Sequence, residues 1–283
     1  MSFKPFDRLP VIEWAPWWDQ TIAPWFEQGL PKSLMPSAAE PQDEMAPSNR
    51  INRHLGLDIY ELPYLQGLSA VPPGMEKKVG KVTNIDDYRR VREYLYPWPA
   101  FNRDWWRSRV EAQKRGEVVL WGEPMGYFFF ARNLLGIEEH FCALAEQPDL
   151  IHAINDDLFD QHLKIFDDLF SICTPDFISF AEDMSYNHGS MLSKAMFDEY
   201  MGSYYSRLAP RLKEKGVFVI VDSDGDITIP AGWFQAAGVE GMLPLERQSG
   251  VDAVKMRQMY PRMRFIGCFD KMTMFHGESA MRG

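Results

Sequence analysis

Four segments of this 283-residue chain share one format, in which an apolar stretch runs directly into charged side chains. In the clearest of them, Val217–Ile227, five apolar residues lead into three aspartates. That pattern is typical of a buried parallel strand whose carboxyl end opens onto a charged site. The other three segments are Phe177–Asp183, Gly241–Glu246 and Arg264–Lys271.

The order of strand-like and helix-like segments predicts the fold. From residue 117 onward the two kinds alternate, which indicates a parallel sheet with right-handed crossovers. Charged groups at successive strand ends are the layout of an α/β enzyme with a (β/α)₈ TIM barrel. Three further short strands, near Val11, at 58–62 and at 117–122, bring the expected total to seven. We therefore expect a barrel that lacks its C-terminal strand and helix in this chain.

The chain length and the turn residues predict the domain organisation. A barrel of this kind uses roughly 200–250 residues as one domain, so we expect a single domain over 1–283. Prolines and glycines break residues 31–83, which we expect to form loops or a lid. Periodicity and capping residues predict helices at 48–55, 85–96, 103–115, 137–146, 148–171, 193–215 and 252–259.

Composition excludes several classes of partner. The net charge is −10 with no basic cluster, which argues against nucleic acid and anionic membranes. No apolar run approaches the ~18 residues of a membrane span. The three scattered cysteines, Cys142, Cys173 and Cys268, indicate free thiols and a cytoplasmic location. A small-molecule substrate is the partner that we expect.

Asp222 and Asp224 are the first candidates for catalysis. At positions i and i+2 of an extended strand, both side chains project to the same face. Two close carboxylates do not both ionise at low cost, so either one holds a proton or a cation lies between them. Oxygen ligands alone would favour Mg²⁺, Mn²⁺ or Ca²⁺ over zinc. The alternative is simple turn chemistry around Gly225.

Further candidates follow other strand ends. Glu182 and Asp183 end one strand, and His188 lies in the next loop, where an imidazole could transfer protons near neutral pH. A solvated loop histidine is the alternative. We expect six further side chains to line a substrate site, although core packing is as good an explanation for the tryptophans; they are Trp14, Trp17, Trp18, Tyr186, Glu246 and Lys271.

Several blocks of the sequence, taken in order, resemble the uroporphyrinogen decarboxylase superfamily. They are DRLPVIEWAPWW (7–18), GEPMGYFFFARNLLGIEEH (122–140), EDMSYNHGSMLS (182–193), VDSDGDI (221–227), GVEGMLPLERQSGVD (238–252) and YPRMRFIGCFDK (260–271). The resemblance implies a barrel with its site at the strand ends. The family holds porphyrinogen decarboxylases, and zinc methyltransferases that exchange methyl groups with corrinoid proteins or thiols.

The chain departs from both well-known active sites of that family. The decarboxylases carry paired arginines near the N-terminus, where this chain has Arg8 alone. The methyltransferases place a zinc-binding His-x-Cys-Gly where this chain has Asp222-Ser-Asp-Gly225. The resemblance therefore implies no zinc His-x-Cys site and leaves the cofactor unknown, with a divalent metal at Asp222 and Asp224 as one hypothesis.

Three hypotheses for function remain open at this point. The first is transfer or removal of a one-carbon (methyl) group on a small neutral, aromatic or cationic molecule, with a corrinoid protein as a possible partner. The acid-rich strand ends favour it, because another anion within ~4 Å of an unpaired carboxylate costs about 4 kcal/mol. The second is decarboxylation of a porphyrinogen or other carboxylated aromatic. The third is a non-catalytic binding barrel.

Overall fold

A computed structural model of the chain describes residues 8, 10–13, 17–35, 46–61, 64–66 and 69–282. Its contacts group into two compact units. Unit 1 comprises Met1–Pro63 with Asp104–Trp121, and unit 2 comprises Tyr64–Arg103 with Gly122–Gly283. The prediction of one domain over 1–283 stays a prediction.

Unit 1 is mainly helical. Its described elements are α1 (Asp19–Glu27), η1 (Lys32–Leu34), α2 (Ala46–His54), β1 (Tyr60–Glu61) and α5 (Arg103–Lys114), the last of which begins at the final residue of a unit 2 segment. β1 pairs in parallel with the start of β3 (Val119–Pro124). The Arg8 guanidinium binds the Asp58 carboxylate, and Asp58 also accepts from the Val11 N–H, so this stretch is anchored by side chains.

Unit 2 contains the remaining elements. The strands are the second half of β3, β2 (Tyr64–Leu65), β4 (Phe177–Ala181), β5 (Ser185–Tyr186), β6 (Gly189–Ser190), β7 (Phe218–Asp222), β8 (Gly241–Leu245) and β9 (Arg264–Gly267). The helices are α3 (Glu76–Val79), α4 (Ile85–Val91), η2 (Arg92–Tyr94), α6 (Tyr127–Leu135), α7 (Ile137–Glu146), α8 (Pro148–Phe170), α9 (Lys194–Phe197), η3 (Asp198–Gly202), α10 (Ser203–Glu214), α11 (Pro230–Ala236), η4 (Arg247–Ser249), α12 (Ala253–Met259), η5 (Lys271–His276) and α13 (Glu278–Arg282).

The sheet of unit 2 is parallel, in the order β2-β3-β4-β7-β8-β9. Because the strands are parallel, all their carboxyl ends meet at one edge. A separate antiparallel hairpin, β5–β6, follows β4. The α/β fold with this sheet is compatible with an incomplete (β/α)₈ barrel, and closure into eight strands stays a prediction.

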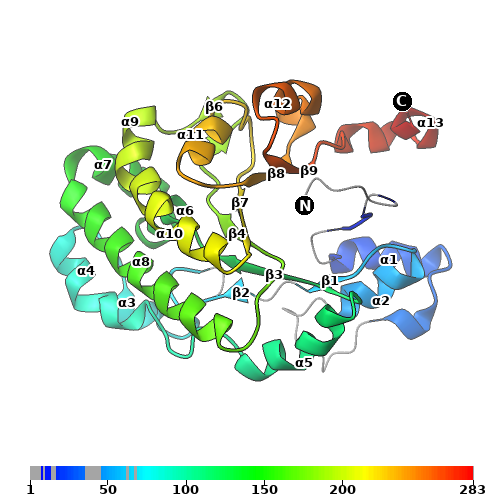
Figure 1. Ribbon diagram of the computed structural model, residues 1–283, viewed down its shortest axis with the longest axis horizontal. Helices are drawn as coiled ribbons and strands as arrows, with labels where there is room; N and C mark the ends of the chain where they lie inside the picture. Colours follow the sequence, from blue (N-terminus) through cyan, green and yellow to red (C-terminus); the bar gives the residue numbers. More distant parts are fainter. Residues whose placement is uncertain are drawn as a thin grey trace. The chain divides into compact units, whose positions relative to one another are not determined.

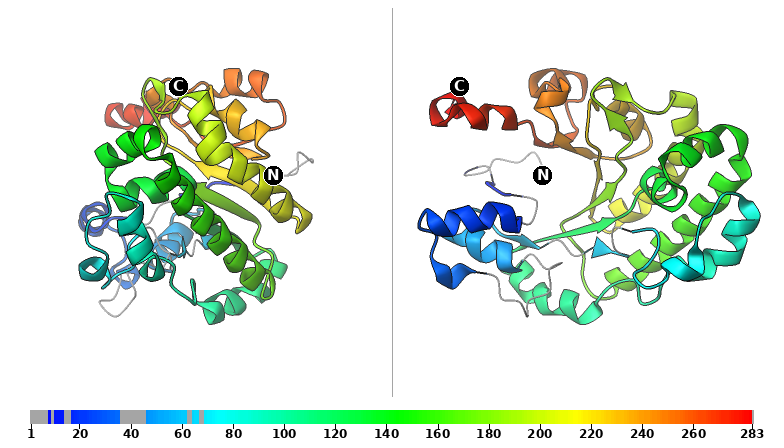
Figure 2. Two further views of the ribbon diagram at one scale, coloured as in Figure 1. Left: turned by 90° about the vertical axis from the view of Figure 1, so that its left-hand side faces the viewer. Right: turned by 180° about the vertical axis from the view of Figure 1, so that it is seen from behind.

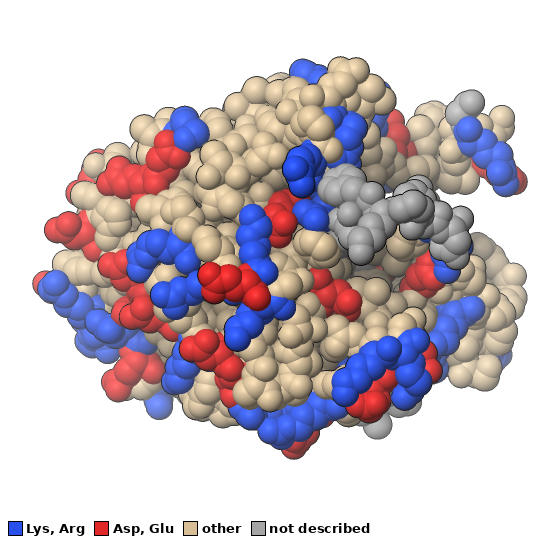
Figure 3. Space-filling view, in the orientation of Figure 1, with Lys and Arg blue, Asp and Glu red and all other residues tan. Residues whose placement is uncertain are grey.

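Helices cover the sheet where the sequence is most apolar. Figures 1 and 2 show the long helices α8 and α10 running beside β4 and β7. The core of β7 consists of fully buried Val219, Ile220 and Val221, which is the buried-strand pattern predicted for this segment. On the face shown in Figure 3, basic and acidic side chains are interspersed. Among the described residues, no helix is both long and apolar enough to cross a bilayer.

Most of the predicted elements of unit 2 are confirmed. Asn84 caps α4 through its side chain, Ser193 caps α9, and Pro148 opens α8 as expected. The predicted helix at 85–96 ends earlier, because a 3₁₀ turn follows Val91. The 193–215 helix contains a π-helical turn, η3, between its two α-helical parts.

One predicted strand is absent from the described residues, and several helices were not predicted, α1 and α6 among them. The strand expected near Val11 is absent from the described residues 10–13. Helix α1 was not predicted because Pro24 lies inside it. Helix α6 was not predicted because its apolar run lacks a clear polar face, so the sequence indicated only that it is buried. The second omission matters for the site, because α6 contacts the two acids that follow β4.

Candidate functional site

Five carboxyl side chains meet at the strand ends of unit 2, and we call them the acid cluster. Each comes from the end of a strand or the residues just after it. They are Glu123 from β3, Asp183 after β4, Asp222 and Asp224 from β7 and the loop behind it, and Glu246 after β8. Parallel pairing of β4, β7 and β8 brings these ends together, as the sequence predicted.

The innermost members of the cluster are Glu123 and Asp222, which hydrogen-bond to each other. Glu123 is 4% exposed and Asp222 is half-buried. Burial raises the pKa of Glu123 to about 7, while the bond to Asp222 opposes that rise. Burial, the Glu123 charge and the Asp183 charge raise the pKa of Asp222 well above its usual range. Both pKa values are raised, so the pair as a unit retains a proton near neutral pH, and the hydrogen bond between the two carboxyl groups shares it.

Asp183 forms one wall beside this pair. Its backbone is in the left-handed region, with φ +46°, which aspartate tolerates better than most residues. One carboxylate oxygen accepts from the Asp224 N–H at 3.3 Å, and the other lies 3.4 Å from the Arg132 guanidinium. Arg132 also donates to the Asp183 carbonyl at 2.9 Å. Asp183 is thus fixed between helix α6 and the loop after β7.

Asp224, Glu246 and Lys271 form the outer part of the site. Burial and the charges of Glu246 and Asp183 raise the pKa of Asp224 to about 6, and Lys271 opposes that rise. The Lys271 ammonium lies 3.3 Å from a Glu246 oxygen at the exposed rim. Glu246 also accepts from the Gly225 N–H at 2.8 Å, so it positions the loop that carries Asp224.

The hairpin β5–β6 packs on that same loop. Gly225 has φ +87°, and a Cβ there would lie 2.5 Å from the Tyr186 backbone nitrogen, so only glycine fits. The Asp226 N–H donates to the Tyr186 carbonyl, which completes the contact. The Tyr186 and His188 rings touch each other edge-on and are exposed. No described contact joins the His188 ring to the acid cluster, so its predicted catalytic role stays a prediction.

Glu182 does not belong to the acid cluster, which corrects the sequence-based pairing of Glu182 with Asp183. Its carboxylate is fully buried and accepts three backbone N–H groups at the start of α6, from Tyr127, Phe128 and Phe129. The Tyr205 hydroxyl donates to it at 2.5 Å. With four donors at a helix N-terminus, the side chain acts as a helix cap, and its predicted catalytic role stays a prediction.

The three tryptophans predicted to line a substrate site belong to the sequence range of unit 1. Trp14 is outside the described residues. The Trp17 indole donates to Asn52 at 2.8 Å and packs edge-on against Trp25, which favours the packing explanation for this side chain. Trp18 is 73% exposed. A substrate contact by any of them stays a prediction.

Two charged side chains near the rim have different partners. The Arg247 guanidinium, although adjacent to Glu246 in the sequence, lies 3.8 Å from Asp252 and donates to the Val251 carbonyl. Lys271 is the cation that pairs with Glu246. Lys271 therefore lies at the site rim, and Arg247 belongs to the turn before α12.

The cluster does not offer a ready metal centre. No three His, Cys, Asp or Glu side chains in the described part of the chain are arranged to hold an ion together. Asp222 moreover uses its carboxyl group in the bond to Glu123. The metal at Asp222 and Asp224 stays a prediction, and we derive no chemical step through it.

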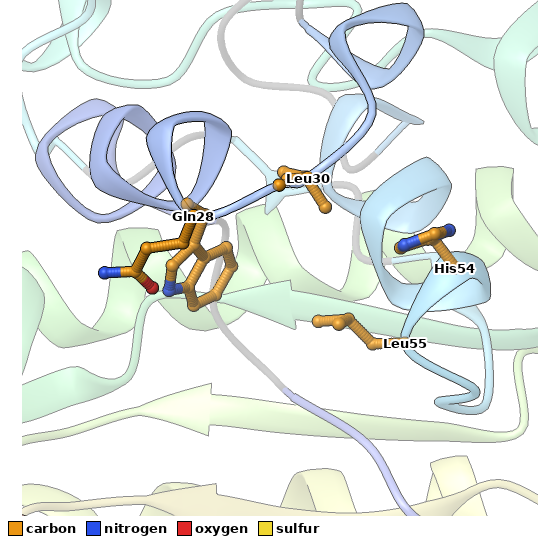
Figure 4. A pocket seen from close by; sticks show the side chains of 6 residues that line it. Gln28, Leu30, His54 and Leu55 are labelled. Atoms are coloured by element: carbon orange, nitrogen blue, oxygen red, sulfur yellow. The ribbon is translucent and has the colours of Figure 1, made fainter.

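Unit 1 has a separate hollow of about 290 Å³, lined by Trp25, Gln28, Gly29, Leu30, His54 and Leu55. Figure 4 shows Gln28 and His54 on opposite sides, with Leu30 and Leu55 between them. The lining contains no carboxyl group. Because reactive sites gather titratable groups with displaced pKa values, the acid cluster is the better candidate.

Comparisons with known proteins find a similarity of structure and none of sequence family. No protein-family model matches the sequence, and no curated protein matches it. A solved structure of a methyltransferase from Methanosarcina mazei is similar over 93% of this chain and 79% of its own, with 16% identity and a TM-score of 0.59. That likeness supports a methyltransferase-like α/β fold and, at this identity, nothing finer.

Two site residues were missed from the sequence. Glu123 follows a predicted strand in the same format as the other acids, so its position could have flagged it. Arg132 could not be found this way, because it reaches Asp183 from a helix that was not predicted.

Proposed function

We propose that this chain is an enzyme of the uroporphyrinogen decarboxylase superfamily, nearer its methyltransferase-like branch. It would transfer or remove a methyl group on a small neutral, aromatic or cationic molecule at the acid cluster. The methyltransferase-like fold supports the general kind of chemistry. The single observation that carries the proposal is the Glu123–Asp222 pair, a proton donor and acceptor at the strand ends.

The pair can supply what removal of a methyl group requires. When the bond between the methyl group and a substrate heteroatom breaks, the bonding electrons stay on the heteroatom, which then needs a proton. The pair retains a proton that it can donate to the heteroatom, and because two adjacent carboxylates repel each other, the pair then takes up a replacement proton from solvent. The methyl acceptor would belong to a partner, and a corrinoid protein is the one that the resemblance implies.

The charge of the site favours a substrate without negative charge. Both nearby cations are engaged, Arg132 by Asp183 and Lys271 by Glu246. A carboxylate placed within ~4 Å of an unpaired acid at an effective dielectric near 20 costs about 4 kcal/mol. This argues against a porphyrinogen with many carboxylates as substrate.

A transfer assay tests the proposal. The purified protein is incubated with ¹³C-methyl-labelled amines, methoxylated aromatics and methyl thioethers, with chemically reduced free cob(I)alamin or a thiol as acceptor, and labelled products are followed by NMR. We expect transfer from at least one class, and its loss in Asp222→Asn and Glu123→Gln. Glu138→Gln, an exposed acid in the first turn of α7, is the matched control and should be unaffected.

Two results would overturn the proposal. One is transfer that survives in both acid variants, because the pair would then have no part in the chemistry. The other is formation of decarboxylated product from uroporphyrinogen with no methyl transfer, which would favour the decarboxylase hypothesis.

A further inference from the structure

The hollow of unit 1 is formed by the ends of two helices. Helix α1 contributes Trp25, and the turn behind it contributes Gln28 and Leu30. Helix α2 contributes its last residue, His54, and Leu55 follows directly. The Leu30 N–H donates to the Trp25 carbonyl at 2.8 Å, and the Leu55 N–H bonds the preceding turn of α2 at 2.9 Å. The lining side chains therefore project from hydrogen-bonded backbone.

A chain of contacts beside the hollow ties α1 to α2. Trp25 packs edge-on against Trp17, with ring centroids 4.9 Å apart. The Trp17 indole N–H donates to buried Asn52 of α2 at 2.8 Å, and the Trp17 backbone N–H donates to the Ser48 hydroxyl at 3.0 Å. Because these contacts fix both helix ends, the hollow is already formed before a ligand enters, which lowers the cost of binding.

The walls of the hollow leave apolar surface in contact with water. Leu55 is 49% exposed, and Trp25 and Leu30 are each partly exposed. A cavity of roughly 150 Å³ holds one benzene ring, so the hollow, at about 290 Å³, has room for one substituted ring or two fused rings. A flat ring placed here would remove apolar area of both partners from water, which favours binding.

Two polar side chains stand at opposite ends of the hollow. Figure 4 shows Gln28 on one side and His54 on the other, with Leu30 and Leu55 between them. Within the part of the chain that the structure describes, neither the Gln28 amide nor the His54 ring has a hydrogen-bond partner, so both are free to bond a ligand. The lining contains no Asp, Glu, Lys or Arg, so a charged ligand would lose water there without gaining an opposite charge.

We propose that the hollow of unit 1 is a binding site for a small, flat, neutral aromatic molecule with hydrogen-bonding groups at two opposite ends. The ring packs on Trp25, Leu30 and Leu55, and its polar groups bond Gln28 and His54. Four of the six lining residues are exposed, so the site is open and its affinity is modest. The site belongs to unit 1 alone and does not depend on the proposed function.

An NMR titration with isonicotinamide tests the proposal, because the amide and the ring nitrogen of this molecule lie at opposite ends of one flat neutral ring. In protein labelled with ¹⁵N-tryptophan, the indole N–H signal of Trp25 is assigned by its absence in Trp25→Phe. We expect that signal to shift saturably with a Kd of about 0.1–1 mM, the range for a ligand of about ten heavy atoms. The signal of Trp233 in α11 should stay in place.

Two further probes separate the parts of the recognition. Isonicotinate has the same ring with a carboxylate in place of the amide, so it tests the preference for a neutral ligand. Cyclohexanecarboxamide keeps an amide but has no flat ring, so it tests the contact with the aromatic and aliphatic walls. Each should bind at least about fivefold more weakly than isonicotinamide.

Substitutions in the lining locate the bound ligand. Gln28→Ala and His54→Ala each remove one hydrogen bond and should raise the Kd about two- to tenfold. Leu55→Ser removes part of the apolar wall and should raise the Kd by a similar factor, about two- to tenfold. Gln20→Ala is the matched control, because it changes an exposed glutamine of α1 that is outside the lining, and it should leave the Kd unchanged. Thermal melting checks that each variant is folded, which we expect because all four side chains are exposed.

Three results would overturn the proposal. One is the absence of a saturable shift of the Trp25 signal up to about 10 mM isonicotinamide. The second is equal affinity for isonicotinate, because the site would then not select a neutral molecule. The third is unchanged binding in the Gln28, His54 and Leu55 variants, because the ligand would then lie elsewhere. None of these measurements involves methyl transfer, so the binding site and the proposed function can fail separately.

Discussion

Two buried carboxyl sites lie at neighbouring strand ends and have opposite surroundings. Glu182 and Glu123 are both buried, and burial raises the pKa of each to about 7. Glu182 accepts four hydrogen bonds from neutral donors, so its negative charge is stabilised locally. Glu123 faces another carboxyl group and the charge of Asp183.

The difference teaches that burial alone does not mark a reactive acid. At Glu182, losing the charge would leave donors of a helix terminus without an acceptor, so the group is built into the fold. At Glu123 and Asp222, the folded protein holds two like charges close together and accommodates them with a shared proton. The first site should stabilise the protein and the second should destabilise it, and substitutions can test both statements.

The largest expected effect comes from Glu182→Ala. It leaves three backbone N–H groups and the Tyr205 hydroxyl buried without an acceptor, which should cost about 3–5 kcal/mol of unfolding free energy. Chemical denaturation measures it. Tyr205→Phe, which removes only one donor, should cost about 1–2 kcal/mol. Equal, small losses in both variants would contradict the capping role.

The next effect is expected for Gly126→Ala. A Cβ at this position would lie 2.1 Å from the Glu182 carboxyl carbon, and that side chain is held by four hydrogen bonds. We expect a loss of about 2–4 kcal/mol. In a Glu182→Ala background, Gly126→Ala should lower the unfolding free energy much less, because the carboxyl group that meets the added Cβ is gone. Additive losses in the double variant would show that Gly126 is needed for another reason.

A smaller effect of opposite sign is expected for Asp222→Asn. The folded-state pKa of Asp222 lies well above its unfolded value, so the wild-type pair loses stability as pH rises through the folded pKa. An asparagine amide can still donate to Glu123 but cannot ionise. The variant should therefore be more stable than wild type by about 1–2 kcal/mol at pH 8.5, with a smaller difference at pH 6.

Comparing the stability of Asp222→Asn with that of wild type over a range of pH isolates the contribution of the Glu123–Asp222 pair. The buried histidines His140 and His162 have lowered pKa values, so they add stability as pH rises toward 6.5, equally in both proteins. Paired denaturation curves from pH 6 to 8.5 give the difference. A variant that is less stable than wild type at every pH would contradict the like-charge account.

The smallest effect is expected for Lys271→Ala. Its ammonium is largely exposed and makes one ion pair with Glu246, so the stability change should stay below about 0.5 kcal/mol. Because Lys271 opposes the rise in the pKa of Asp224, that pKa should move further above 6 in the variant. Carboxyl ¹³C NMR checks the shift. An unchanged Asp224 titration would place Lys271 outside the site.

The sequence predicted the strand ends better than the side chains that act there. Alternation of buried strands and helices indicated a parallel sheet, and the acids Asp222, Asp224 and Glu246 do meet at its edge. Sequence could not say which of Glu182 and Asp183 faces the acid cluster, since that depends on strand register and on the helix α6 that follows β3. It also could not give Arg132, whose partner is 51 residues away along the chain.

The sequence by itself determined the local facts: apolar runs that become β4, β7 and β8, capping residues that start α4 and α9, and carboxyl groups placed where strands stop. These follow from short-range pattern, because burial and hydrogen bonding of a segment depend first on its own residues. Only the tertiary structure decided which acid is satisfied and which is strained. Charge effects act across space, so a carboxyl group acquires its chemistry from Tyr205 or from Glu123 only after distant segments have packed together.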